Sequence, residues 1–439
     1  MSAESQSVPA ETPDGLPLPA PVAPDPLSLA AVLRIAPMRR LWYAQVVSSF
    51  GDFVALFAVM TIMTFTMHAT PQQITGVQIA YMLPIAVLGI ISGVFVDRWP
   101  LKPTMVSSDF IRAGLCLLLI LVHNVWGFYA VLAAISVVSS VFTPAQGIAV
   151  RSAVPLHGMR SAQALMQQVM FIMRIIGAPL ASLLLVRFTA ISCFIIDAVS
   201  FVASGLFIVS VALKSTPKSA VILDPEKKEK TGLAKVLDDM KQGTSFIVHH
   251  AGLFFVIVAM AAAMFVLGCF GPLIAVYVRD ILHASTKTFG ITSAMIGVGL
   301  MAGINVLTMA AKRVSNNVLV YTGLIGIAVG TSIMAGIPHI AAAVVGLLII
   351  GFAVGGIIVP SQTMIQEETP QSMLGRVGST VMSLVFTAQI LGLVLSGILA
   401  DHISVRSVFA LCAAMLVVLA IAGKVWMEPK PLSAEERRA

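Results

Sequence analysis

The sequence consists of long apolar runs that carry almost no charge and are separated by short polar breaks. Most of these runs are long enough to cross the hydrocarbon of a bilayer as a helix, which takes about 20 residues. Only 11% of the residues are charged, whereas a soluble domain uses about a quarter to cover its surface. The sequence therefore predicts an all-α membrane protein with twelve transmembrane helices. The twelve runs are 41–67, 74–96, 104–122, 125–150, 161–186, 189–213, 251–278, 288–311, 317–336, 340–366, 375–400 and 403–426.

A polar stretch after the sixth run divides the protein into two halves of six helices. Three residues recur at one constant offset, which indicates an internal duplication: Pro144, Gln146 and Arg160 are repeated as Pro360, Gln362 and Arg376. Two duplicated bundles with a site between them form the architecture of an alternating-access carrier. We expect a disordered Pro-rich tail over 1–38, a six-helix bundle over 39–213, a connector with an amphipathic helix over 214–250, a second bundle over 251–427 and a tail over 428–439.

The basic residues fall mainly in alternate breaks between the runs. By the positive-inside rule, this bias places both termini in the cytoplasm. The breaks assigned to the outside hold only Arg187, Arg279, Lys287 and Arg406. The same bias accounts for the formal net charge of +7 without a nucleic-acid partner, so we expect the lipid bilayer as partner and no nucleic acid.

Motifs of soluble enzyme chemistry are missing from the sequence. The four cysteines lie inside apolar runs without C-x-x-C spacing, so we expect neither a disulfide nor a metal site. No G-x-x-x-x-G-K-[ST], H-E-x-x-H or G-x-S-x-G motif occurs, and each of these would have indicated a phosphate-binding loop or a hydrolytic site. We therefore predict no cofactor and no enzymatic activity. A secondary carrier of a small-molecule substrate remains.

Several short motifs resemble those of one family. Gly93-Val94-Phe95-Val96-Asp97-Arg98, between the second and third runs, resembles the Gly-x-x-x-Asp-Arg loop signature of the major facilitator superfamily. Asp109-Phe110-Ile111-Arg112 is similar to the branch that contains macrolide-efflux and enterobactin-exporter proteins. Further motifs similar to that branch contain Asp52, Arg174, Asp197 and Gly375-Arg376. The resemblance implies two pseudo-symmetric six-helix bundles in a bacterial inner membrane, and proton-coupled efflux of drugs or siderophore-like amphiphiles by a monomer.

The resemblance also implies a cytoplasmic gate. It places Asp97 near the start of the eleventh helix, where exposed backbone N–H groups carry partial positive charge. A carboxylate at that point, with other charges beside it, would latch the inner side shut. The alternative is that these charges only fix topology and anchor helix ends. The expected gate residues are Gly93, Asp97, Arg98, Asp109, Arg112, Gly375 and Arg376.

Three charged residues fall deep inside apolar runs, where each needs a partner or a function. They are Asp52, Arg174 and Asp197, and one bound proton would neutralise their formal sum of one negative charge. We expect one carboxylate to pair with Arg174 and the other to carry a proton, because desolvation disfavours its charged form. Asp52 is the favoured carrier, since it shares a helix face with Gln45 and Ser49, whereas Asp197 has apolar neighbours. The alternative is a static ion-pair cluster that orients the helices.

Polar and flexible residues within the runs are candidates for a central substrate cavity. The expected lining residues are Gln45, Ser49, Gln167, Met170, Gln362, Ser383 and Gln389. Hydrogen bonds between helices are the alternative role for the polar ones, and lipid-facing packing is the alternative for Met170. Two other functions stay open: an uptake carrier or lysophospholipid flippase of the same fold, and a non-transporting membrane scaffold or sensor.

Overall fold

A computed structural model of the chain describes residues 27–96, 99–211, 233–310, 314–370 and 373–426. Within these ranges the chain forms helices joined by loops, and no strand. The two predicted tails up to residue 26 and beyond residue 426, and the part of the connector before residue 233, lie outside the described residues.

The first six long helices form one bundle. They pack on one another as sequence neighbours and across the bundle, for example α3 on α5 and α2 on α7. They are α2 (Ala36–Thr61), extended by the π-helical turn η1 (Ile62–Thr66); α3 (Pro71–Val96); α4 (Leu101–Leu118), followed by the 3-10 turn η2 (Leu119–Leu121); α5 (Val125–Ala153); α6 (Met159–Arg187), preceded by the 3-10 turn η3 (Leu156–Gly158); and α7 (Ala190–Val209).

The last six long helices form the second bundle, and one further helix lies in the connector. They are α8 (Leu233–His249) in the connector, then α9 (Ala251–Asp280), α10 (Thr286–Ala310), α11 (Asn316–Gly336), α12 (Ile340–Glu368), α13 (Leu374–His402) and α14 (Val405–Trp426). Among the described residues, 11 helices are long and apolar enough to cross a membrane, and α3, with 26 residues, has the length to be the twelfth. The predicted all-α, twelve-helix fold is confirmed.

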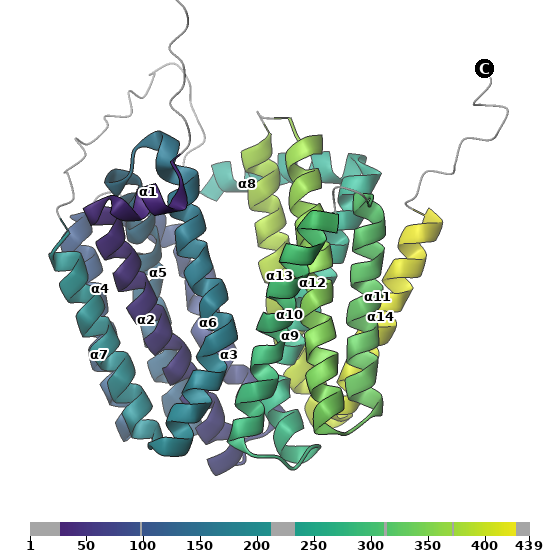
Figure 1. Cartoon of the computed structure of the whole chain (residues 1–439), viewed down its shortest axis with the longest axis horizontal. Helices are drawn as coiled ribbons and strands as arrows, with labels where there is room; N and C mark the ends of the chain where they lie inside the picture. Colours follow the sequence, from purple (N-terminus) through teal and green to yellow (C-terminus); the bar gives the residue numbers. More distant parts are fainter. Residues whose placement is uncertain (1–26, 97–98, 212–232, 311–313, 371–372, 427–439) are drawn as a thin grey trace, which may run out of the picture.

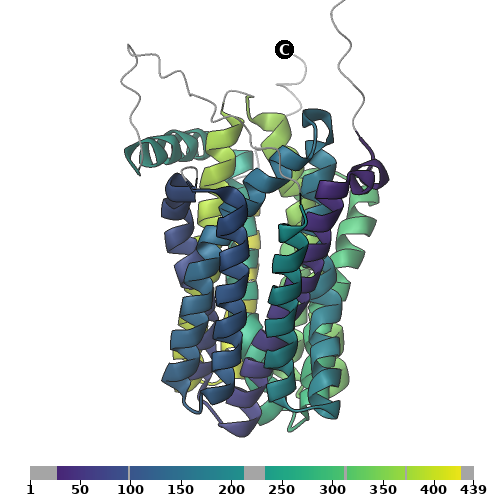
Figure 2. The ribbon, with the colours of Figure 1, turned by 90° about the vertical axis from the view of Figure 1, so that its left-hand side faces the viewer.

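The two bundles stand side by side with their helices roughly parallel (Figure 1). The connector helix α8 runs across one end of the molecule, nearly perpendicular to the long helices (Figure 2). We call this end, where α8 lies and where α14 finishes, the connector end. The opposite end carries the loops at 67–70, 122–124, 188–189, 281–285, 337–339 and 403–404, and we call it the far end.

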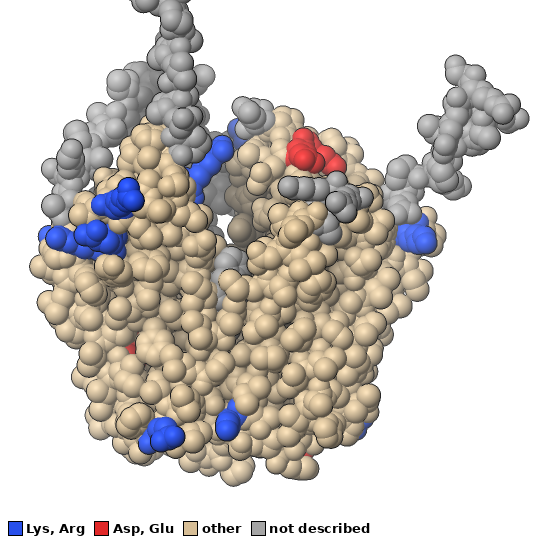
Figure 3. Space-filling model, in the orientation of Figure 1, with Lys and Arg blue, Asp and Glu red and all other residues tan. Residues whose placement is uncertain are grey.

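The bundles touch each other near the far end. Phe57 of α2 stacks on Phe289 of α10, with ring centroids 4.6 Å apart. Small residues allow close approach: a Cβ added at Gly290 of α10 would lie 2.2 Å from Ser182 Cβ of α6. Toward the connector end the bundles separate, and the space-filling surface is hollowed between them (Figure 3). The structure is therefore closed at the far end and open at the connector end.

The predicted extent of the disordered tail, to residue 38, is wrong. Residues Leu29–Arg34 form the short helix α1, and α2 already begins at residue 36. Val32 is fully buried in an apolar cluster at the connector end. The segment is also tied to the turn before α6, because Leu27 N donates to His157 O at 3.2 Å and Ser161 Oγ donates to Leu27 O at 2.5 Å. Apolar side chains that follow Pro26 thus order this segment.

Helices α10 and α12 pack along a seam of glycines. A Cβ at Gly299 would lie 2.2 Å from Leu348 O, and one at Gly351 would lie 2.1 Å from Ile296 O. Gly303 and Gly355 continue the seam one turn further on each helix. An added Cβ would lie 2.3 Å from Phe352 O and 2.8 Å from Ile304 N, respectively. Small residues four apart let transmembrane backbones approach in this way. The two helices are therefore held in one fixed pair.

We predict that Gly351→Val destabilises the protein by about 1–3 kcal/mol, because the new side chain overpacks a seam bounded by backbone that cannot shift cheaply. Thermal unfolding of the purified protein in detergent measures the change. Gly147→Val in α5 is the matched control, since nothing lies within 4 Å of a Cβ at that position. Equal melting temperatures for the two variants would contradict the seam.

Candidate functional site

Helix α4 carries a buried ion pair in the first bundle. Asp109 and Arg112 lie one turn apart on α4 and form a salt bridge through Asp109 Oδ1 and Arg112 Nη2. Both side chains are almost completely buried. The guanidinium also stacks between two aromatic rings, with Arg112 Cζ 4.3 Å from the ring centroids of both Phe142 and Phe201. Burial, the carboxylate and the two rings together fix the position of this cation.

Asp197 on α7 is buried and has two polar side chains beside its carboxylate. The Cys116 thiol of α4 donates to Asp197 Oδ2 at 2.9 Å, and Ser200 Oγ donates to Asp197 Oδ1 at 3.3 Å. The carboxylate also lies directly against α2, because a Cβ added at Gly51 would be 2.4 Å from Asp197 Oδ1. Only glycine fits at position 51, and its absent side chain lets the carboxylate reach the backbone of α2.

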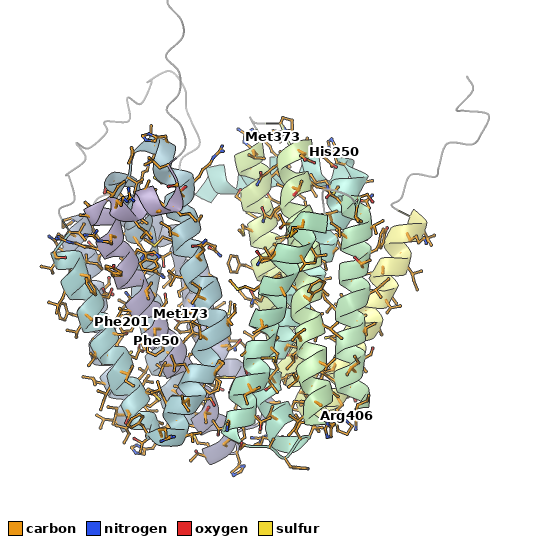
Figure 4. All side chains as sticks on the ribbon, viewed as in Figure 1. Phe50, Met173, Phe201, His250, Met373 and Arg406 are labelled. Atoms are coloured by element: carbon orange, nitrogen blue, oxygen red, sulfur yellow. The ribbon has the colours of Figure 1, made fainter. Side chains whose placement is uncertain are left out.

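Asp52 follows Gly51 on α2 and is half-buried. Tyr81 of α3 donates its hydroxyl to Asp52 Oδ1 at 3.5 Å. Because Asp197 Oδ1 lies against Gly51, the residue before Asp52, the two acids are neighbours across the contact of α2 with α7. Neighbouring residues of this cluster, Phe50 and Phe201, lie about midway between the two ends of the first bundle (Figure 4). The structure therefore brings two of the three predicted intramembrane charges together in the middle of the bundle.

Arg174 holds a defined place on α6, although its side chain lies outside the described part. On α6, Ser182 and the backbone of Ala178 meet Gly290 of the second bundle. Helical periodicity carries this face toward the connector end through Gln167. Gln167 is exposed, so this face continues from the closed far end into the open half.

Three of the four predicted cavity residues of the first bundle, Gln45, Ser49 and Met170, join Gln146 in one chain of contacts across three helices. Gln146 Nε2 on α5 donates to Gln45 Oε1 on α2, and Gln45 Nε2 donates to Ser49 Oγ at 2.8 Å. Ser49 Oγ in turn lies 4.0 Å from Met170 Sδ on α6, and Met170 is 39% exposed. The chain thus reaches from the buried interior of the bundle to an accessible side chain.

The predicted cavity residues of the second bundle are less closely associated. Gln362 on α12 is exposed, whereas Ser383 and Gln389 on α13 are half-buried. The backbone oxygen of Gln389 lies against Gly268 of α9, 2.2 Å from an added Cβ, so that part of α13 is packed within the bundle. The described hydrogen bonds do not link these three residues to the chain of contacts in the first bundle.

The predicted gate residues do not gather at one place in the described structure. Asp97 and Arg98 lie outside the described residues, and Gly93 lies near the end of α3. Asp109 and Arg112 are in the interior of the first bundle, where α4 packs on α5 and α7. This differs from the expected position beside the gate, because Asp109 and Arg112, on the third and fourth turns of α4, face α7. Their closeness in sequence to Asp97 is therefore not closeness to the second bundle.

The other predicted gate residues lie at the connector helix. Arg376, near the start of α13, donates from Nη1 to Gln242 Oε1 of α8 at 2.8 Å. Gly243 of α8 lies so close that an added Cβ would be 2.7 Å from Arg376 O. Next to it, Gly375 faces open space. Arg376 thus fastens α8 to the second bundle.

Sequence patterns did not indicate all the partners in this cluster. Tyr81 and Cys116 stand in apolar runs without a motif, so nothing in the sequence pairs them with Asp52 and Asp197. Gln146 had a signal, because it recurs in the second half as Gln362. No group of three or more metal-ligating side chains occurs among the described residues, and the four cysteines are free and buried.

The profile of the Major Facilitator Superfamily matches residues 41–389 and, in a second match, residues 256–439. The chain belongs to the Major Facilitator Superfamily. The family predicted from the loop signature is thereby confirmed, and the chain is a multi-pass membrane transporter and not an enzyme.

Its relatives include both efflux proteins and transporters of unstated substrate. The chain is 27% identical to the uncharacterized MFS-type transporter YfiS of Bacillus subtilis (strain 168), covering 86% of this chain and 90% of that protein. It is 23% identical to macrolide efflux protein A of Streptococcus pyogenes, covering 87% and 93%. It is 24% identical to the multidrug efflux pump Tap of Mycolicibacterium fortuitum, covering 79% and 85%.

Solved transporters share the fold at low sequence identity. The nucleoside transporter NupG superposes with a TM-score of 0.68 at 14% identity, covering 90% of this chain and 100% of that one. A bacterial homolog of the human lysosomal transporter Spinster, in an inward-facing and unoccupied conformation, has a TM-score of 0.68 at 11% identity, covering 88% and 96%. These likenesses establish the fold alone.

We predict that Arg112→Met destabilises the protein by about 3–5 kcal/mol, because it leaves the Asp109 carboxylate buried without its counter-charge. The double variant Asp109→Leu/Arg112→Met should recover most of this loss, since both charges are then gone. Thermal unfolding in detergent compares the three proteins. A double variant that melts no higher than Arg112→Met would show that the ion pair is not the source of the effect.

Proposed function

We propose that the chain is a proton-coupled exporter of amphiphilic small molecules that works by alternating access. The observation that carries this proposal is the pair of carboxylates, Asp52 and Asp197, in the middle of a membrane bundle. Similarity to macrolide efflux protein A and to the multidrug efflux pump Tap over most of the chain supports export as the direction.

A titratable carboxylate in the membrane needs compensation for its charge. Asp109 already has Arg112 as its partner, so that pair is neutral as a unit. Asp52 and Asp197, taken with Arg174, leave one negative charge, and one proton would neutralise it. Asp197 accepts from the Cys116 thiol and shares the single proton of the Ser200 hydroxyl with its own backbone oxygen, and these donors stabilise a carboxylate. Among the described hydrogen bonds, Asp52 has the long one from Tyr81 and it is half-buried, so Asp52 is the proposed proton carrier.

The proposed orientation has the connector end in the cytoplasm. Basic side chains gather at this end of the first bundle (Figure 3), as the positive-inside rule requires of cytoplasmic loops. Two of them also bind backbone at the end of α7: Arg40 donates from Nη1 to Ser210 O, and Lys102 Nζ donates to Val211 O at 3.1 Å. In this orientation, in a bacterial inner membrane, the structure is the state open to the cytoplasm.

The opening between the bundles is the proposed substrate path. Gln45, Ser49 and Met170 would contact substrate from the first bundle, together with Gln167. Gln362, Ser383 and Gln389 would contact it from the second. A thioether and a row of amides fit a ligand with an apolar body and a few polar groups. We further propose that Asp97 and Arg98 close the connector end against the start of α13, and that the chain works as a monomer.

Accumulation of a panel of macrolides and fluorescent amphiphiles in exporter-deficient cells tests the function. We expect the chain to lower accumulation of at least one compound, and a protonophore to abolish that effect. Unchanged accumulation for the whole panel would contradict export of amphiphiles, and increased accumulation would favour uptake instead.

We predict that Asp52→Asn removes proton coupling, because an amide side chain, unlike a carboxylate, takes up no proton near neutral pH. Inside-out vesicles supplied with a compound from the screen in the medium should lose the uptake that an imposed pH gradient drives. Asp401→Asn, at an exposed position near the end of α13, is the control and should keep it. Undiminished coupling in Asp52→Asn would overturn the assignment of the proton carrier.

A further inference from the structure

Arg279, the penultimate residue of α9, makes charge-assisted hydrogen bonds between the two bundles. Its Nε and Nη2 donate to the two carboxylate oxygens of the neighbouring Asp280, at 2.6 Å and 2.7 Å. Its Nη1 donates to two backbone oxygens of the first bundle, Thr64 O and Ala69 O, both at 2.9 Å. The bidentate pair with Asp280 orients the planar guanidinium, so the remaining nitrogen points across the boundary.

The two acceptors are available because of how the first membrane helix ends. α2 widens into the π-helical turn Ile62–Thr66, and the chain then leaves the helix through His68, whose φ is 50°. Met67 N donates to Ile62 O and Ala69 N donates to Met63 O. Neither of these two hydrogen bonds uses Thr64 O as its acceptor. Terminal carbonyls of a helix lack intrahelical partners and carry partial negative charge, which suits a guanidinium.

The other described contacts between the bundles at the far end are apolar or close-packed. They include the Phe57–Phe289 stack and the approach of Gly290 to Ser182. These contacts contribute close packing and involve no charged side chain. Arg279 adds charge-assisted hydrogen bonds, which are stronger than neutral ones. Because the far end lies at a membrane surface, water can replace these two bonds when the bundles part, so the contact is reversible.

We propose that Arg279 is a releasable latch of the far-end gate: its bonds to Thr64 O and Ala69 O hold the far side closed, and the guanidinium must leave them before that side opens. This inference rests on the alternating access proposed above. Arg279 acts here as a positioning residue, since it contacts backbone of the gate and sets the balance between the two states of the carrier.

The chain offers a matched control in Arg406. Its Nε donates to Ala335 O at 2.7 Å and its Nη2 donates to Gly336 O at 3.1 Å, so it also binds two carbonyls at the end of a helix. It lies at the far end of the second bundle (Figure 4), but its acceptors belong to α11 of the same bundle. Arg406 therefore has the same chemistry without bridging the boundary.

The test measures how often the far side opens, without needing a substrate. Ser182→Cys on α6 places a thiol under Gly290, at a position that is 3% exposed and that opening would uncover. A membrane-impermeant maleimide is added from the outside to cells that carry this reporter. We expect Arg279→Gln to raise the labelling rate about tenfold by shifting the population toward the open state. Arg279→Lys should be intermediate, because one ammonium cannot reproduce the fork.

Two controls separate the latch from a loss of folding. Arg406→Gln should leave the labelling rate of the reporter unchanged, and the four buried native cysteines should stay unlabelled in every variant. Equal labelling of Arg279→Gln and the parent reporter protein would overturn the latch, and so would an equal rise in Arg406→Gln. Labelling does not depend on export, so a failed drug-accumulation screen would leave this result standing, and a failed latch would leave the screen standing.

Discussion

The hydrocarbon core of a bilayer offers no hydrogen-bond partners, and the rest of this structure depends on that constraint. It requires every backbone bond to be made within a helix, so the chain is helical wherever it crosses. It also requires each deep polar side chain to find a partner inside the protein. Asp109 has Arg112, Arg112 has two aromatic faces, and Asp197 has a thiol and a hydroxyl. Among the described contacts, Asp52 has a single long hydrogen bond, from Tyr81.

The two bundles share a fold but divide the chemistry unequally. Charged side chains lie deep in the first bundle, whereas those of the second bundle's membrane helices lie near helix ends, as with Arg376, Asp401 and Arg406. The second bundle is instead built on close backbone contacts, such as the glycine seam between α10 and α12. This division fits the proposed cycle, in which the first bundle binds the proton and the second is a rigid unit beside it.

The sequence was sufficient for the helices and insufficient for the partners of the buried acids. Apolar length predicts each crossing directly, because the bilayer sets it, and the duplicated Pro144 and Pro360 indicate two halves. The family resemblance placed Asp109 among the gate residues, but helical rotation turns Asp109 toward α7. Likewise, no pattern in the sequence pairs Cys116 with Asp197, since that contact exists only after α4 packs on α7. The short helix α1 was missed because its apolar residues follow a run of prolines.

The aromatic sandwich around Arg112 has a consequence for how the first bundle transmits a signal. Phe142 belongs to α5 and Phe201 to α7, so a single cation on α4 binds three helices together. α4 packs within its own bundle, while α2, α3 and α6 pack on the second one. Loss or gain of a proton next to such an immobile group cannot be absorbed by local rearrangement there. In the proposed cycle the displacement would pass to α2 instead, and Gly51, where α2 touches Asp197 without a side chain between them, is where that helix meets the acid directly.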